Sequence, residues 1–418
     1  MKRLIFLNRF FAPDHSPTSQ LLSDLAFHMS DAGTDVHVIT SRQLYDAPEA
    51  ALPREELVSG VKVHRVATTT FGRTALSGRA IDYASYYASM WHCARSYVRR
   101  GDILIAKTDP PVASIFALQV VAKRNARLVN WLQDIYPELA AATGVPLMKG
   151  SVGQRIARLR NLSLTRAAAN VVVGQRMAEH VKSLGAAPNR IHVIPNWIDD
   201  EQIRPVQHDE NPLRIEWGLQ ERFVIGYAGN LGRAHEFDTV LAASELLQND
   251  PRILFLFVGG GHQFERLARA VKDRRLGGNF RFVPYQPQSL LRYSLNVADV
   301  HLVSLKPELE GLLVPSKFYG AAAVGRPVIS ITAADGEIAQ LVRKHNCGIV
   351  VEPGNGQRLA EELMLLSKNP TRAAEMGGRA RAMLEASFSR RQALAHWRHL
   401  LTALQGEALE AELPATAL

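Results

Sequence analysis

Short apolar runs alternate with segments of helical periodicity along the first half of the chain. In residues 18–32 the apolar side chains from Leu21 to Met29 recur at the spacing of one helix face, and Gly33 is expected to end that helix. An apolar, β-rich run over residues 35–40 follows, so the order is strand, helix, strand. Further strands are predicted over residues 3–10, 61–66, 103–106, 128–131, 170–173 and 191–194.

The second half of the chain repeats this alternation from the beginning. Its predicted strands cover residues 223–228, 253–258, 280–283, 300–304, 327–331 and 348–351, with amphipathic helices between them. Three more helices are predicted between residues 359 and 404. Strands that alternate with helices indicate parallel sheets covered on both faces. The predicted fold class is therefore α/β, with two doubly wound Rossmann-like domains.

The domain boundary is predicted over residues 195–212, a segment rich in proline, asparagine and aspartate. We therefore expect an N-terminal domain over residues 1–195 and a C-terminal domain over residues 196–390. Residues 391–418 are expected to hold a helix that packs back on the N-terminal domain, followed by a frayed tail. Doubly wound sheets bind ligands at the carboxyl ends of their strands, and both sets of ends are expected to face a cleft.

Composition limits the class of protein. The 418 residues are 47% hydrophobic and 21% charged, an ordinary globular mixture that is too long for one core. Cys93 and Cys347 lie far apart, which favours buried reduced thiols over a metal site. The apolar run at the start is broken at Asn8, and the longest apolar stretch is shorter than the roughly 20 residues of a membrane span. We expect a cytoplasmic protein.

Charge is distributed unevenly between the two halves. Residues 1–195 hold 24 Lys and Arg against 14 Asp and Glu, a balance of +10, and the remainder holds 25 against 26, a balance of −1. Within residues 149–190, eight basic residues accompany the single acid Glu179. A basic face of this kind indicates either a solvated helix face or contact with an anionic membrane surface. Nucleic acid is disfavoured because no zinc-finger spacing, aromatic RNA-binding string or dense basic tail is present.

Residues 308–331 carry the most informative pattern. Glu308 and Glu310 come first, and the pair Pro315–Ser316 predicts a helix start with Lys317 one residue inside it. The candidates for ligand contact in this segment are Leu313, Val314, Pro315 and Ser316. A helix N-terminus and a lysine favour a phosphate, and acids beside them can hold sugar hydroxyls. This combination is typical of a site for a nucleotide sugar.

Two glycine-containing turns follow strands of the second half. Gly229, Asn230, Gly232 and Arg233 form the first, which indicates either a phosphate site or a plain turn. Gly259 and Gly261 in the second form only an incomplete dinucleotide fingerprint. Since the opening turn of the chain also lacks glycine, a dehydrogenase is disfavoured. Tyr285 lies in a loop that either contacts a base or is simply stiffened by proline.

Acidic residues follow two strands of the first half. Asp134 comes after a buried strand, where it is expected either to orient or deprotonate an acceptor hydroxyl or to cap the next helix. Asp14 and His15 occupy the matching place after the first strand and are candidates for acceptor binding, although a lone histidine is more often structural.

Taken together, these segments resemble the retaining glycosyltransferases of family 4, which have the two-domain GT-B architecture. The resemblance runs through nearly the whole chain and rests on the segments at residues 10–15, 33–40, 194–199, 227–232 and 320–329. The segments Gln133–Glu138 and Pro315–Lys317 are similar to those of bacterial enzymes of surface-polysaccharide assembly, of lipopolysaccharide or exopolysaccharide.

The resemblance implies roles for individual residues. Arg233 and Lys317 would contact the donor diphosphate, and Glu308 or Glu310 would match the acid that binds the donor sugar. The glutamate that grips the ribose in the family is replaced by Gly320 here, and Glu337 is a candidate to supply that contact. A lysine usual after the glycine turn is also missing, since His235 or Glu236 stands there.

The expected activity is transfer of a hexosyl or N-acetylhexosaminyl group from a nucleotide sugar, with a UDP-sugar favoured, to a lipid-linked saccharide. No cofactor and no metal are expected. The basic N-terminal domain would lie against the anionic inner face of the plasma membrane. Two alternatives remain: a nucleotide-sugar epimerase of the same architecture, and a non-catalytic nucleotide-sugar-binding or membrane-adaptor protein.

Overall fold

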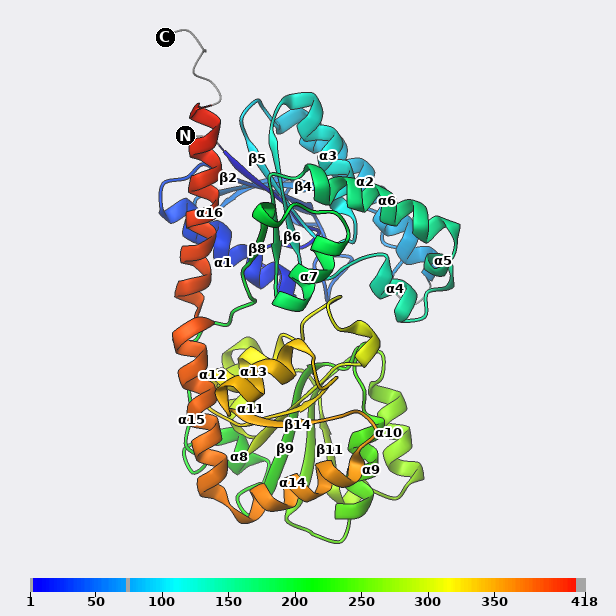
Figure 1. The fold of residues 1–418 in the computed structure, drawn as a ribbon, viewed down its shortest axis with the longest axis vertical. Coiled ribbons are helices and arrows are strands. Elements are labelled where there is room, and N and C mark those ends of the chain that lie inside the picture. Colours follow the sequence, from blue (N-terminus) through cyan, green and yellow to red (C-terminus); the bar gives the residue numbers. More distant parts are fainter. Residues whose placement is uncertain (1–2, 73–75, 411–418) are drawn as a thin grey trace. The chain divides into compact units, whose positions relative to one another are not determined.

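The structure is a computed structural model, and it describes residues 3–72 and 76–410. The chain forms two compact units (Figure 1). Unit 1 holds Met1–Pro195 and Ala393–Leu418, and unit 2 holds Asn196–Gln392. The first division falls at the start of the segment in which the sequence predicts a boundary. The tail expected to fray is residues 406–418. Residues 406–410 of it are helical instead, and the rest lies outside the described residues.

Unit 1 is built on an eight-stranded sheet in the order β3-β4-β2-β1-β5-β6-β7-β8. Its strands are β1 (Leu4–Leu7), β2 (Val36–Ser41), β3 (Glu55–Val58), β4 (Val61–Val66), β5 (Ile103–Lys107), β6 (Arg127–Leu132), β7 (Ala169–Val172) and β8 (Ile191–Val193). Its helices are α1 (Pro17–Asp31), α2 (Leu76–Tyr97), α3 (Ala113–Arg124), α4 (Glu138–Ala142), α5 (Pro146–Lys149), α6 (Ser151–Arg166), α7 (Gln175–Ser183) and most of α16 (Arg390–Glu410).

The central strands of this sheet are buried throughout. Every residue of β1 and β5 is buried, because helices cover both faces of a parallel sheet. Strand β3 was missed by the sequence analysis. It pairs with β4 antiparallel, and three of its four residues are exposed, so its sequence lacks the apolar run by which the other strands are recognised.

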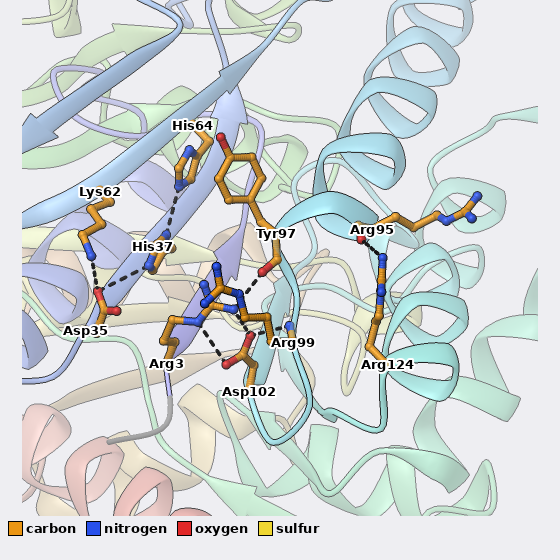
Figure 2. Close-up of polar contacts among 10 residues, drawn as sticks. All are labelled: Arg3, Asp35, His37, Lys62, His64, Arg95, Tyr97, Arg99, Asp102 and Arg124. Atoms are coloured by element: carbon orange, nitrogen blue, oxygen red, sulfur yellow. Dashed lines mark hydrogen bonds and ion pairs between the residues drawn. The ribbon is translucent and has the colours of Figure 1, made fainter.

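Polar contacts link the residue before β1 to the end of α2, and strand β2 to strand β4 (Figure 2). Arg3 donates hydrogen bonds to Asp102 and to the backbone oxygen of Tyr97. His37 Nδ1 on β2 lies 2.9 Å from His64 Nε2 on β4. Burial lowers the pKa of both histidines, which favours neutral imidazoles at neutral pH. These contacts thus join strands β2 and β4 to each other, and the residues that precede β1 and β5 to the end of α2.

The C-terminal helix α16 packs on unit 1. Its buried Trp397 lies with its ring centroid 4.6 Å from that of Trp131 on β6. Arg127, at the start of β6, donates to the backbone oxygen of Leu404. These contacts hold helix α16 against strand β6 of the N-terminal half.

Unit 2 is built on a six-stranded parallel sheet in the order β11-β10-β9-β12-β13-β14. Its strands are β9 (Phe223–Asn230), β10 (Ile253–Gly260), β11 (Phe280–Val283), β12 (Val300–Ser304), β13 (Val328–Ile331) and β14 (Gly348–Val351). Its helices are α8 (Pro212–Glu216), α9 (Asp238–Leu247), α10 (Phe264–Asp273), α11 (Leu291–Asn296), α12 (Lys317–Ala323), α13 (Glu337–His345), α14 (Gly356–Lys368) and α15 (Pro370–Ser387).

The predicted α/β class is confirmed by these two sheets. Strands β9 and β10 run two residues further than predicted, so each ends inside a glycine turn. Helix α9 begins at Asp238. Within the described ranges, no helix combines the length and the apolar character needed to cross a lipid bilayer.

Candidate functional site

The two glycine turns of unit 2 pack directly on each other. The residues Gly229, Gly259 and Gly261 have φ of +117°, +141° and +124°, a region that side-chain-bearing residues rarely adopt. A Cβ on Gly259 would lie 2.2 Å from the backbone oxygen of Gly229, and one on Gly261 would lie 2.1 Å from Asn230 Oδ1. The glycines are therefore required for packing at the ends of β9 and β10, whatever ligand they contact.

The side chain of Gln263 holds the glycine turn that follows β9. Gln263 Nε2 donates to the backbone oxygens of Gly232 at 2.6 Å and His235 at 2.9 Å. The turn is thus held from outside its own segment, so its backbone geometry is set before any ligand binds.

Lys317 lies against this turn. A Cβ on Gly229 would lie 3.3 Å from Lys317 Cε, so the lysine side chain crosses the place that a larger residue would fill. Its Nζ lies 3.2 Å from His235 Nε2 and 5.0 Å from the centroid of the Tyr227 ring. Burial lowers the pKa of Lys317 to about 8. The amine therefore remains mostly protonated at neutral pH and brings one positive charge to the turn.

The predicted helix start is present, but it is small. Helix α12 begins at Lys317 and has seven residues, and its N-cap residue Ser316 makes no capping hydrogen bond through its side chain. Val314 and Pro315 are buried and Leu313 is half-buried, so they anchor the segment that leads into the helix. The positive charge of this segment comes mainly from the lysine.

Arg233 and Tyr285 flank the glycine turns. Arg233 is exposed, and among the described residues it has no hydrogen-bond or ion-pair partner. The Tyr285 side chain is 59% exposed, and its ring lies 3.2 Å from the place where a Cβ on Gly260 would stand. The turn after β9 thus carries an exposed cation, and the turn after β10 lies beside an exposed aromatic ring.

The carboxylate of Glu310 lies at the start of helix α13. Its Oε2 accepts a hydrogen bond from the backbone N–H of Glu337 at 3.2 Å, and a Cβ on Gly336 would collide with it. Glu310 therefore caps this helix, a role that the sequence analysis did not foresee. Glu308 is exposed, and Gly320 is buried in α12 close to Leu295.

In unit 1, the loop after β1 uses Asp14 for its own structure. Asp14 is buried, its Oδ1 accepts from the Ser16 N–H at 2.8 Å, and its Oδ2 accepts from the Tyr45 N–H. Both oxygens of the candidate carboxylate are thus engaged by neighbouring backbone. His15 beside it is exposed.

Asp134 follows β6 in a charged cluster with Lys107 and Asp109. Burial and, after it, the charge of Asp109 raise the pKa of Asp134 to about 7, against the opposing charge of Lys107. Lys107, at the end of β5, is buried with its Nζ 3.7 Å from the Trp131 ring centroid, and burial lowers its pKa to about 7. Helix α4 begins at Glu138 with Pro137 as N-cap, so Asp134 is not its cap.

Neither Lys107 nor Asp109 was predicted from the sequence. The available signal was a lysine at the end of an otherwise apolar strand, followed two residues later by an acid. A buried lysine and two acids with shifted pKa values at neighbouring strand ends are typical of functional sites.

In the part of the chain that the structure describes, no three side chains of His, Cys, Asp or Glu gather in an arrangement that could hold a metal ion.

Comparison with known proteins places both units in one class. The family model "Glycosyl transferases group 1" matches residues 209–383, inside unit 2, and the model "Glycosyl transferase 4-like domain" matches residues 19–197. The chain belongs to the glycosyltransferases. Both halves of this glycosyltransferase are covered, so the family resemblance seen in the sequence is confirmed.

Individual relatives agree with this family. WbjE of Pseudomonas aeruginosa, named as a probable glycosyltransferase, is 27% identical over 305 residues, which are 70% of this chain and 72% of WbjE. WcaI of Escherichia coli K12, whose name assigns it provisionally to colanic acid biosynthesis, is 28% identical over 63% of this chain and 66% of WcaI. Among solved structures, HepE of Anabaena in complex with UDP-glucose has a TM-score of 0.72 at 18% identity, covering 96% of this chain and 100% of HepE. The glycosyltransferase thus has the GT-B fold.

Proposed function

We propose that this protein transfers a sugar from a nucleoside diphosphate sugar, with retention at the anomeric carbon, to a hydroxyl of a lipid-linked saccharide. The observation that carries the proposal is the pair of cations at one strand end in unit 2. Lys317 lies against the turn of Gly229, and Arg233 projects from the same turn without a protein partner among the described residues. Such a turn fits a diphosphate.

The chemistry of this reaction asks little of the protein beyond charge stabilisation and positioning. The bond between the anomeric carbon and the diphosphate oxygen breaks, and a bond to the acceptor oxygen forms. Negative charge grows on the departing diphosphate, where Lys317 and Arg233 would stabilise it. Asp134 in unit 1 would orient the acceptor hydroxyl and receive its proton. No cofactor takes part in this scheme.

A UDP-sugar is the first donor to test, because the structurally similar HepE was solved with UDP-glucose. The exposed ring of Tyr285 beside the second turn offers a surface on which a base can stack. The donor sugar would be a hexose or an N-acetylhexosamine. The name of WcaI supports a place in the assembly of a bacterial polysaccharide, either lipopolysaccharide or exopolysaccharide.

Thermal stability in the presence of nucleotides tests the donor site directly. A ligand that binds only the folded protein raises the melting temperature by mass action, so UDP and UDP-sugars should stabilise the parent protein. The Arg233→Ala variant should melt like the parent without ligand, because the side chain is exposed, and should gain much less from UDP. An unchanged gain in the variant would refute the assignment of Arg233 to the diphosphate.

Incubation with the donor alone separates the alternatives. An epimerase would convert the nucleotide sugar in the absence of an acceptor, whereas a transferase leaves it intact or hydrolyses it slowly. Donor binding without turnover across lipid-linked and free acceptors would support a non-catalytic binding protein.

A basic, apolar face on α5 and α6 suits contact with an anionic membrane. The exposed apolar side chains on it are Leu147, Val152, Leu159 and Leu162, and the exposed basic ones are Lys149, Arg155, Arg158 and Arg166. Along α6, Val152, Arg155 and Leu159 share one stripe at helical spacing. Arg160, which the sequence analysis counted with this basic run, is buried and donates to the Tyr136 backbone oxygen at 2.7 Å.

Vesicle flotation tests this face. The protein should float with vesicles that contain anionic phospholipid, and binding should fall as salt rises, because each basic residue near such a surface contributes about 1 kcal/mol. Replacing Leu159 and Leu162 by serine should reduce flotation, while the Leu365→Ser change on α14, at a residue as exposed as Leu159, should not. Equal binding to neutral vesicles, or no loss in the double variant, would count against a membrane role for α6.

A further inference from the structure

His235 is held in one tautomer by its surroundings. The side chain is buried, and its Nδ1 lies 2.6 Å from the backbone oxygen of Ser304. A carbonyl oxygen can only accept a hydrogen bond, so the proton of the ring is on Nδ1. The opposite nitrogen, Nε2, is therefore a bare acceptor. Burial, with a smaller effect of Lys317, lowers the pKa of His235 to about 3, which keeps the ring neutral.

The acceptor nitrogen of His235 faces the amine of Lys317. The distance from Nζ to Nε2 is 3.2 Å, and because an ammonium group can only donate, the lysine is the donor. The Tyr227 ring, 5.0 Å from Nζ, and the backbone of Gly229 border the same amine. Three groups from β9 and the loop after it thus direct a lysine that comes from α12.

We propose that His235 is a positioning residue for the donor diphosphate, which holds the Lys317 ammonium at the glycine turn by accepting its hydrogen bond. This inference rests on the proposed function. The lysine that the family usually carries after the glycine turn is absent from this sequence, and His235 or Glu236 stands in its place. The structure brings Lys317 to it from 82 residues further along the chain, with His235 as the group that fixes its position.

Two isosteric variants separate the two hydrogen bonds of the ring. In His235→Gln the amide stands near the place of Nε2, so an oxygen remains to accept from Lys317 while the bond to Ser304 is lost. In His235→Asn the amide stands near the place of Nδ1, so the bond to Ser304 is kept and the acceptor for Lys317 is lost. UDP affinity by calorimetry and melting temperature without ligand are measured for both, with Lys317→Met as reference.

The expected result is a difference in UDP affinity between the two variants. His235→Gln should bind UDP within about threefold of the parent, and His235→Asn should bind about tenfold or more weakly, as expected when a charged group loses a hydrogen bond. Equal affinities in the two variants would overturn the positioning role. If Lys317→Met itself binds UDP like the parent, the proposed donor site fails, and this outcome is distinct from failure of His235 alone.

A measurement on the parent protein keeps the proposal testable if a variant does not fold. The 15N chemical shifts of the His235 ring should show a protonated Nδ1 and a bare Nε2. The Nε2 signal should move on addition of UDP, since the anion draws the ammonium, and hence its shared proton, toward itself. A protonated Nε2 would exclude the arrangement proposed here.

Discussion

Replacing Lys317 by methionine should lower kcat/KM for sugar transfer by about 10²–10³-fold, the loss typical when one charge-stabilising group of a transition state is removed. Methionine keeps an apolar side chain as far as Cε, the atom that passes Gly229, so the turn itself should remain intact. The ammonium, however, disappears from the place where the diphosphate gains charge. Steady-state kinetics with a saturating acceptor would measure the effect, and UDP binding should weaken in parallel.

UDP affinity should depend on pH through the charge of Lys317. Burial lowers the pKa of Lys317 to about 8, so the amine is charged below that pH and neutral above it. The bound diphosphate requires the charged form. Affinity should therefore be highest below about pH 8 and fall as the pH rises through it, and the fall should vanish in Lys317→Met. Lys344→Met, an equal charge change on the exposed end of α13, is the matched control and should leave both properties unchanged. The same pH profile in Lys317→Met as in the parent would assign the titration to another group.

Replacing Asp134 by asparagine should lower kcat by about 10²–10⁴-fold, the range of general acid–base catalysis. The carboxylate form is the one that can receive the proton of the acceptor hydroxyl. Burial and the neighbouring Asp109 raise the pKa of Asp134 to about 7, so the active form appears only as the pH rises through about 7. The parent should show this acidic limb in kcat/KM, and Asp134→Asn should lack it. With Lys317, the profile becomes a bell between about pH 7 and pH 8.

Asp109 provides the control for this assignment. Its charge is one of the causes that raise the pKa of Asp134, so Asp109→Asn should move the acidic limb of the kcat/KM profile to lower pH. If the acidic limb of the kcat/KM profile lies at the same pH in Asp109→Asn as in the parent, Asp134 is not the titrating residue.

The Asp134→Asn variant, which should lose activity, should gain thermal stability. A carboxyl whose folded pKa lies above its unfolded value destabilises the protein as the pH rises between the two values. Asp134→Asn should therefore melt higher than the parent near about pH 8 and gain little near about pH 4.

The alternation of apolar runs with helical segments was sufficient to predict the α/β class and nearly all the strands. Burial on both faces of a parallel sheet requires a continuous apolar run, which is a local property of the sequence. Strand β3 escaped prediction because it lies at the sheet edge and carries Glu55 and Glu56, so it has no such run. Glycine turns and the lysine that opens α12 were also visible locally, since each needs a particular residue at a particular place.

Contacts between distant segments were beyond the reach of the sequence. Whether a carboxylate caps a helix or binds a ligand depends on which backbone faces it, and only the fold places Glu310 at α13 and Asp14 at the backbone of Tyr45. The shifted pKa of Asp134 likewise depends on burial beside Lys107 and Asp109, which come from another strand.

The sequence by itself thus determined the sheets, the turns at the strand ends and the family, because periodicity, glycine and short motifs act over a few residues. The tertiary structure decided how the charges are paired. It brought Lys317 to His235 across 82 residues and gathered Lys107 with Asp134, because electrostatic interactions depend on distance in space and on burial rather than on separation along the chain.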